Sequence, residues 1–143
     1  MVVRTSSSVD LDSSAASVRP WVTDLARYPQ WMPLVHSAET DGEDAWNVEI
    51  RARVGPLARS KRLRMRRASD EGSRVRFERA ETDGKVHAPW TLEVHLSERE
   101  TGCSVTVEMV YGGSLWTGGI LDKVLAQQIE AGKAGLARVT RTS

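Results

Sequence analysis

The sequence predicts an α+β fold in which an antiparallel sheet of about seven strands curves around one long C-terminal helix. Three features lead to this prediction: two short helical segments after a first strand, a series of period-two segments, and a final amphipathic stripe. We expect residues 1–143 to form a single domain, because a chain of this length can bury one sizeable core. We found no internal repeat and no linker rich in Pro, Gly or Ser.

The first part of the chain combines a weak strand with two short helices. Residues 3–11 alternate between apolar and polar side chains, which indicates a strand. Residues 12–14 (Asp-Ser-Ser) offer an N-cap, and apolar residues follow at helical spacing over 15–25. Pro20 lies inside this segment, where it predicts a kink or the start of a second turn. Residues 28–33 (Tyr-Pro-Gln-Trp-Met-Pro) predict a compact turn.

From Leu34 onward the apolar residues recur at every second position, as in strands with one buried face. Turn signals at 55–56, 83–84 and 101–102 separate the segments, and the longest alternating run covers 86–96. Short strands joined by tight turns predict an antiparallel meander. The residues that we expect to point toward the helix are Trp46, Val48, Ile50, Leu63, Met65, Val75, Phe77, Trp90, Leu92, Val94, Val107, Met109 and Tyr111.

The last apolar pattern has the spacing of a helix and follows a glycine-rich break. Its stripe consists of Leu115, Ile120, Leu121, Val124, Leu125, Gln128, Ile129, Leu136 and Val139. Gly132 and Gly135 each lower the helix propensity by about 1 kcal/mol relative to Ala. They indicate either a close approach to the sheet or a weak helix end.

The composition excludes several classes of protein. A formal net charge of +1 gives no global reason to expect nucleic acid as a partner. The single cysteine, Cys103, excludes an intramolecular disulfide and a multi-cysteine zinc site, and we expect it to be an inert core thiol. We see no signal peptide and no apolar run long enough to span a bilayer, so we expect a cytoplasmic protein.

No motif for a catalytic nucleophile, a phosphate loop or a metal helix occurs, so we predict no catalytic residue, no metal and no cofactor. An acid–base reaction inside a cavity leaves no local motif, and an enzyme therefore stays an open alternative. We expect His87 and His95 on the face opposite Trp90. We expect His36 to be solvated or locally bonded, with a position at the mouth of a cavity as the alternative. Tyr111 and Gln128 are the polar groups that we place on the inner face.

The chain has one strong local charge bias, which consists of Arg59, Lys61, Arg62, Arg64, Arg66 and Arg67. We expect these residues to form a positive stripe on the outer face of neighbouring strands. Outward glutamates can pair with them across strands, so a solvated, ion-paired face is the simplest interpretation. The alternative is weak contact with an anionic surface through Arg59, Arg62, Arg64 and Arg66.

Residues 9–18 (VDLDSSAASV) and 21–33 (WVTDLARYPQWMP) resemble the opening of bacterial polyketide cyclase/dehydratase proteins of the START-like superfamily. The break from Gly112-Gly113 to Gly119 before the final helix is similar too. The resemblance covers essentially the whole chain and departs from the usual pattern at Arg19-Pro20, where the helix of the family is unbroken. Its motifs mark a fold rather than an activity.

The resemblance implies the helix-grip fold of lipid-transfer domains and plant pathogenesis-related allergens, with an elongated cavity between sheet and helix. Members bind lipids, sterols, polyketides or plant hormones there, and a few cyclise or dehydrate polyketides. We therefore expect a hydrophobic small molecule as the partner; a cyclase/dehydratase, an interaction module with a basic sheet face, and a packed core without a cavity are the alternatives. The expected ligand contacts are Trp31, Trp46, Val48, Ile50, Leu63, Met65, Phe77, Trp90, Leu92, Val107, Met109, Tyr111, Leu125, Gln128 and Ile129.

Overall fold

The computed structural model describes residues 2–54, 56–112 and 120–141, without the side chains of residues 2, 3, 54, 57 and 120–125. The elements are β1 (Val2–Leu11), α1 (Ala15–Thr23), the 3-10 helix η1 (Leu25–Gln30), β2 (Val35–Thr40), β3 (Ala45–Val54), β4 (Leu57–Asp70), β5 (Arg74–Arg79), β6 (Trp90–Arg99), β7 (Gly102–Gly112) and α2 (Ile120–Arg141). Within the described residues, seven strands form one sheet in the order β1-β7-β6-β5-β4-β3-β2. Every neighbouring pair in it is antiparallel, which confirms the predicted α+β fold.

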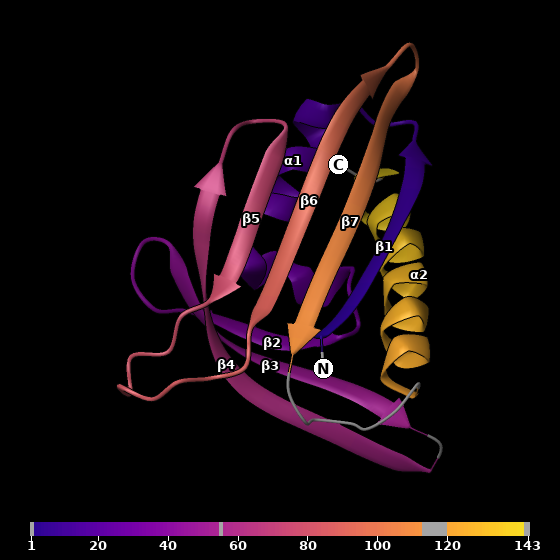
Figure 1. Ribbon diagram of the computed structural model, residues 1–143. Helices are drawn as coiled ribbons and strands as arrows, with labels where there is room; N and C mark the ends of the chain where they lie inside the picture. The colour runs from indigo at the N-terminus through magenta and orange to yellow at the C-terminus, as the bar shows by residue number, and fades with distance from the viewer. Residues whose placement is uncertain (1, 55, 113–119, 142–143) are drawn as a thin grey trace.

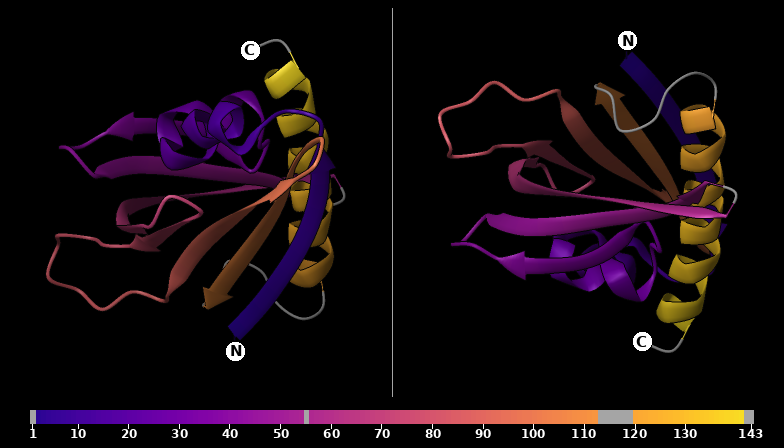
Figure 2. Two further views of the ribbon diagram at one scale, coloured as in Figure 1. Left: turned by 90° about the horizontal axis from the view of Figure 1, so that it is seen from above. Right: turned by 90° about the horizontal axis from the view of Figure 1, so that it is seen from below.

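The sheet is strongly curved, so that β2, β3 and β4 run across behind β5, β6, β7 and β1 (Figure 1). Helix α2 lies along β1 and passes the end of β3 (Figures 1 and 2). Helices α1 and η1 cover the inner side of the sheet at its other end, where η1 contacts β2 and α1 contacts β6 and β7. No helix in the described part of the chain is long and apolar enough to cross a membrane.

The inner face of the sheet forms the core. All thirteen sheet residues that alternation placed on that face are at most 6% exposed. Cross-strand partners share a face, and the register pairs Trp46 with Met65 and Leu92 with Met109. Ile129 and Leu136 add buried side chains from α2 to the same apolar cluster.

Helix α1 begins as its sequence predicts. The side-chain oxygen of Ser14 accepts a hydrogen bond from the backbone N–H of Ser17 at 3.2 Å, which is an N-cap interaction. The helix continues through Pro20 to Thr23, so Pro20 starts no second helix and removes only one intrahelical donor. Asp24 then caps η1, because its Oδ1 accepts from the N–H of Ala26 at 3.0 Å.

The strand predicted over residues 86–96 begins only at Trp90. Residues 80–89 form a connection instead, in which the side chain of Val86 is fully exposed. Pro89 has no N–H to give to a ladder, and proline is tolerated mainly at the edge or the start of a strand. The prediction of a tight hairpin at Asp83-Gly84 is therefore wrong, although Gly84 does have a positive φ of 74°.

The two glycines of α2 lie against the turn that follows η1. A Cβ built on Gly132 would contact the side chains of Met32 and Trp31 at 3.5 and 3.6 Å. The close approach predicted for these glycines is thus real, but it is to this turn and not to the sheet.

Some predictions for the last part of the chain lie outside the described residues. They concern residues 113–119, which include Leu115, and the side chains of Leu121, Val124 and Leu125.

Candidate functional site

A row of large side chains crosses the inner face of the sheet from β3 to β7. Its members are Trp46, Met65, Arg79, Trp90 and Tyr111, linked by the pairs Trp46–Met65, Met65–Arg79 and Trp90–Tyr111. The β5–β6 ladder ends at the pair Glu78–Thr91, so the next residues on each strand, Arg79 and Trp90, follow its last pair. The row therefore spans the sheet at the end where β6 begins and β7 ends.

Two polar atoms of this row are buried without a partner. Among the described residues, neither the Nε1 of Trp46 nor the Nε1 of Trp90 finds a hydrogen-bond acceptor. Trp46 is 3% and Trp90 is 4% exposed, so water does not solvate these donors freely. From α2, the Oε1 of Gln128 is buried in the same way. Most buried polar atoms in proteins have a partner, so these three are exceptions among the described residues.

Aromatic contacts fix the position of these indoles. Trp46 meets Phe77 edge to face with ring centroids 5.6 Å apart, and Phe77 meets Tyr28 at 5.9 Å. Trp90 packs on Tyr111 with a centroid distance of 4.2 Å. The indole rings of Trp46 and Trp90 are thus held in place by aromatic neighbours.

Trp31 and Tyr28, by contrast, use their polar atoms within the fold. The Nε1 of Trp31 donates to the carbonyl oxygen of Trp21 at 2.9 Å, and the Tyr28 hydroxyl donates to the carbonyl oxygen of Val22 at 2.7 Å. Burial raises the pKa of Tyr28 well above its ordinary value, which keeps the hydroxyl protonated. Sequence reasoning placed Trp31 among the ligand contacts and left out Tyr28, whose buried ring completes the aromatic cluster.

The remaining predicted contacts come together as expected in space. Trp31, Val48, Ile50, Leu63, Met65, Leu92, Val107, Met109 and Ile129 are buried in the same cluster as Trp46, Phe77, Trp90 and Tyr111. Gln128 is half-buried, and the side chain of Leu125 lies outside the described residues. Contact of these residues with a ligand stays a prediction.

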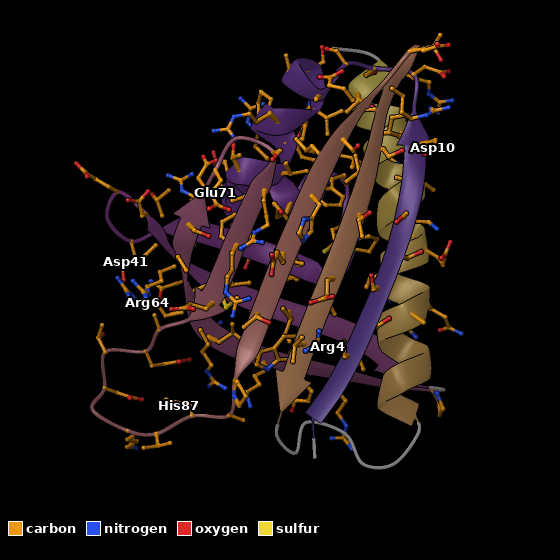
Figure 3. All side chains as sticks on the ribbon, turned by 45° about the horizontal axis from the view of Figure 1, so that its top comes forward. Arg4, Asp10, Asp41, Arg64, Glu71 and His87 are labelled. Atoms are coloured by element: carbon orange, nitrogen blue, oxygen red, sulfur yellow. The ribbon has the colours of Figure 1, made fainter. Side chains whose placement is uncertain are left out.

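The basic stripe differs from its prediction. Arg62, Arg64 and Arg66 do lie outward, and they pair with Glu49, Asp41 and Glu78 respectively. Figure 3 shows Arg64 and Asp41 side by side at the outer edge of the sheet. Their charges are therefore largely compensated, as the simplest interpretation of the stripe expected.

Three members of the predicted stripe lie on the inner face instead. Arg59 is the cross-strand partner of the buried Ala52, and Lys61 is the partner of the buried Ile50. Arg67 reaches the inner side too, since its guanidinium lies over the Trp46 ring at 5.7 Å and donates to the carbonyl oxygen of Thr23 at 2.8 Å. The prediction grouped these residues by charge, whereas strand parity separates them. Contact with an anionic surface through Arg59, Arg62, Arg64 and Arg66 stays a prediction.

The outer side of the sheet carries a polar hollow of about 590 Å³. Its lining includes Ser37, Glu39, Asp41, Asn47, Glu49, Arg62 and Arg64, with residues 81–83 from the connection before β6. Ion pairs within the lining already join Arg64 to Asp41 and Arg62 to Glu49. Most of these side chains lie on the opposite face from the indole donors. Val48 and Leu63 of the inner face also border the hollow, as does Glu81, which binds Arg79 of the inner row.

His95 and Cys103 lie away from the inner row, whereas His87 contacts one member of it, Arg79. His95 pairs with Glu93 on the outer face of β6, as predicted. His87 belongs to the connection before β6 rather than to a strand (Figure 3). Its ring nitrogens contact Asp83 and Arg79. Cys103 is buried, and this burial raises the pKa of its thiol, which agrees with an inert role. Within the described residues, no group of His, Cys, Asp and Glu is arranged to hold a metal ion.

Comparison with known proteins gives one family match. The family model described as polyketide cyclase/dehydrase and lipid transport matches residues 2–142. No curated protein gives a significant sequence match.

Solved structures with the same architecture include a conserved protein from Geobacillus kaustophilus, which is 13% identical, with 99% of this chain and 97% of that chain covered and a TM-score of 0.77. A START superfamily protein from Mycobacterium smegmatis is 13% identical, with 97% of each chain covered and a TM-score of 0.73. The Zhui aromatase/cyclase from Streptomyces sp. R1128 is also 13% identical, with 99% of this chain and 94% of that chain covered and a TM-score of 0.72. At such identities these structures establish the helix-grip fold alone.

Proposed function

Since the chain belongs to the polyketide cyclase/dehydrase and lipid-transport family, we propose that it binds a hydrophobic small molecule between the sheet and α2. The observation that carries this proposal is the set of buried, unpartnered polar atoms on the inner row: the Nε1 atoms of Trp46 and Trp90 and, from α2, the Oε1 of Gln128. A buried polar group without a hydrogen bond costs about 1–3 kcal/mol. A ligand that makes such a hydrogen bond should therefore form a more stable complex than a ligand of the same shape that does not.

The chemistry of these atoms restricts the ligand. An indole N–H is a donor only, so the two tryptophans call for acceptor oxygens on the bound molecule. Arg67 lies over the Trp46 ring and Arg79 belongs to the row, but most of the surroundings are apolar. The side chains of Phe77, Leu92 and Met109 suit a hydrocarbon or aromatic body. We infer a ligand with a hydrophobic skeleton and at least one carbonyl, hydroxyl or similar oxygen that accepts from Trp46 or Trp90.

Native mass spectrometry with organic extraction, on protein purified without added lipid, tests the proposal directly. We expect a co-purified apolar compound at stoichiometric amounts. A clean mass of the free protein, with no thermal shift across a panel of lipids and aromatic polyketides, would contradict binding. Recovery of a compound with a changed mass after incubation would identify turnover, which is the enzymatic alternative.

Substitution of the indole donors tests the observation behind the proposal. Trp90→Phe and Trp46→Phe keep an aromatic ring but remove the N–H, so we expect each to weaken binding of an oxygen-bearing ligand about tenfold. Trp21→Phe is the matched control, because Trp21 is only half-buried and its ring lies under Arg27 at 5.2 Å. Equal losses of ligand affinity in all three variants would show that general packing, and not the indole N–H groups of Trp46 and Trp90, determines affinity.

A further inference from the structure

Lys61 is a cation on the inner face that borders buried apolar residues of β3 and β4. It lies on β4 directly across from Ile50 of β3, which is 4% exposed. Leu63, two residues further along β4, is 5% exposed. Cross-strand partners and every second residue of a strand share a face, so the Lys61 side chain starts on the face of these two residues. Lys61 itself is half-buried.

The charges around Lys61 do not balance within the described part of the chain. The charge of Arg79 acts on Lys61, and the Nε of Arg79 already binds both carboxylate oxygens of Glu81, at 2.7 and 2.8 Å. Lys61 makes no ion pair or hydrogen bond with any described residue. Burial and then the charge of Arg79 lower the pKa of Lys61, whereas the weaker influence of Glu81 raises it. The carboxylate of Glu81 is thus already bound by Arg79, and Lys61 has no ion-pair partner among the described residues.

We propose that Lys61 binds an anionic group of the ligand, so that the molecule held by this protein is an amphipathic organic acid and not a neutral lipid. The inference rests on the proposed function, because it requires a molecule in the interior. An ammonium group has three donors and no acceptor, and an oxyanion such as a carboxylate complements it in both charge and hydrogen bonding.

The position of Lys61 suits a head group that stays partly hydrated. The β3–β4 hairpin extends beyond the rest of the sheet and ends beside the first turns of α2 (Figure 1). Complete burial of an ion pair carries a large desolvation cost for each ion, and partial exposure avoids much of this cost. The apolar body of the acid then lies on the buried residues that Lys61 borders, toward the inner row with Trp46.

Two fluorescent probes with the same ring system separate charge recognition from apolar binding. The first is 8-anilinonaphthalene-1-sulfonate, which is anionic, and the second is N-phenyl-1-naphthylamine, which is neutral. We expect the wild-type protein to bind both, and Lys61→Met to weaken binding of the sulfonate about tenfold or more while leaving the neutral probe unchanged. Lys61→Arg should retain the sulfonate.

Lys85→Met is the matched control, because it removes one lysine from the exposed connection before β6 and leaves the net charge equal to that of Lys61→Met. We expect it to bind both probes as the wild type does. Loss of both probes in Lys61→Met would assign Lys61 a packing role and overturn the inference. An unchanged affinity for the sulfonate would overturn it too, while the proposed function stands on the neutral probe. Failure of the wild type to bind either probe would overturn the proposed function and the inference together.

Discussion

Gly135 of α2 lies so close to the backbone of Trp31 that a Cβ built on it would stand 2.1 Å from the carbonyl oxygen of Trp31. No side chain fits into that space without a shift of either the helix or the turn after η1. The contact therefore fixes where α2 meets the rest of the molecule. Gly135 lowers the intrinsic helix propensity of α2, but its lack of a side chain allows α2 to pack against the turn after η1.

Gly135→Ala should destabilise the protein by about 1–3 kcal/mol, because the cost of overpacking exceeds the gain in helix propensity. Gly132→Ala is the matched control on the same helix: its Cβ would make ordinary contacts at 3.5–3.7 Å. Alanine there gains about 1 kcal/mol of helix propensity, so we expect neutral or higher stability. Urea unfolding of both variants measures the difference. Equal behaviour of the two would contradict a tight contact at Gly135.

Phe77→Ala should cost about 3–5 kcal/mol, which is the range for removing a fully buried phenylalanine. Its ring is 0% exposed and stands between Trp46 and Tyr28 in the aromatic cluster. Val86→Ala is the comparison, because Val86 is fully exposed and its truncation leaves no cavity. Thermal and urea unfolding should separate the two variants clearly. A loss below about 1 kcal/mol for Phe77→Ala would show that the cluster contributes little to stability.

Much of the fold follows from the sequence because the period-two pattern is strong. The alternation of apolar and polar residues alone placed Trp46, Phe77 and Trp90 on the buried face, because one face of each strand packs against the core. The same alternation places Lys61 on the inner face, but the prediction assigned it to the outer face because of its charge. The contact between Gly135 and Trp31 joins distant parts of the chain, and no local pattern reports it.

The unpartnered indole N–H groups of Trp46 and Trp90 could not have been predicted either. A tryptophan at an inward position usually finds an acceptor, as Trp31 does in the carbonyl of Trp21. Only the three-dimensional arrangement shows that Trp46 and Trp90 lack one within the described residues. Strand β6 starts only at Trp90 because Pro89 has no N–H to donate to the hydrogen bonds of the sheet. The prediction followed the alternating pattern and gave Pro89 too little weight.

Tyr28→Phe should destabilise the protein by about 1–2 kcal/mol at neutral pH, because the buried carbonyl of Val22 loses its donor. The effect depends on pH with a defined sign. Burial raises the pKa of Tyr28 in the folded state, so its contribution is complete below the ordinary tyrosine pKa of about 10 and is lost as the pH rises above that value. The stability gap between wild type and variant should therefore narrow in urea unfolding above pH 10. A gap that stays constant would contradict a buried, protonated hydroxyl.

The ion pair of Arg19 and Asp70 should make stability depend on pH in the acidic range. The Nη1 and Nη2 atoms of Arg19 donate to the two oxygens of Asp70 at 2.8 and 2.6 Å, which joins α1 to the end of β4. These hydrogen bonds, and a further one from the N–H of Gly72, lower the pKa of Asp70. A depressed pKa in the folded state means that the stabilisation is present above the unfolded value of about 3.9 and is lost as the pH falls through the folded value.

Asp70→Asn tests this dependence. We expect a loss of at most about 1 kcal/mol at pH 7, since both partners are partly exposed and solvent screens the pair. The difference from the wild type should shrink below about pH 4, because protonation then removes the same charge from the wild-type protein. Asp12→Asn is the control, since Asp12 is exposed and has no ion pair among the described residues. Urea unfolding between pH 3 and pH 7 decides the outcome: an unchanged difference at low pH would show that the substitution disturbs the turn at Gly72 rather than the ion pair.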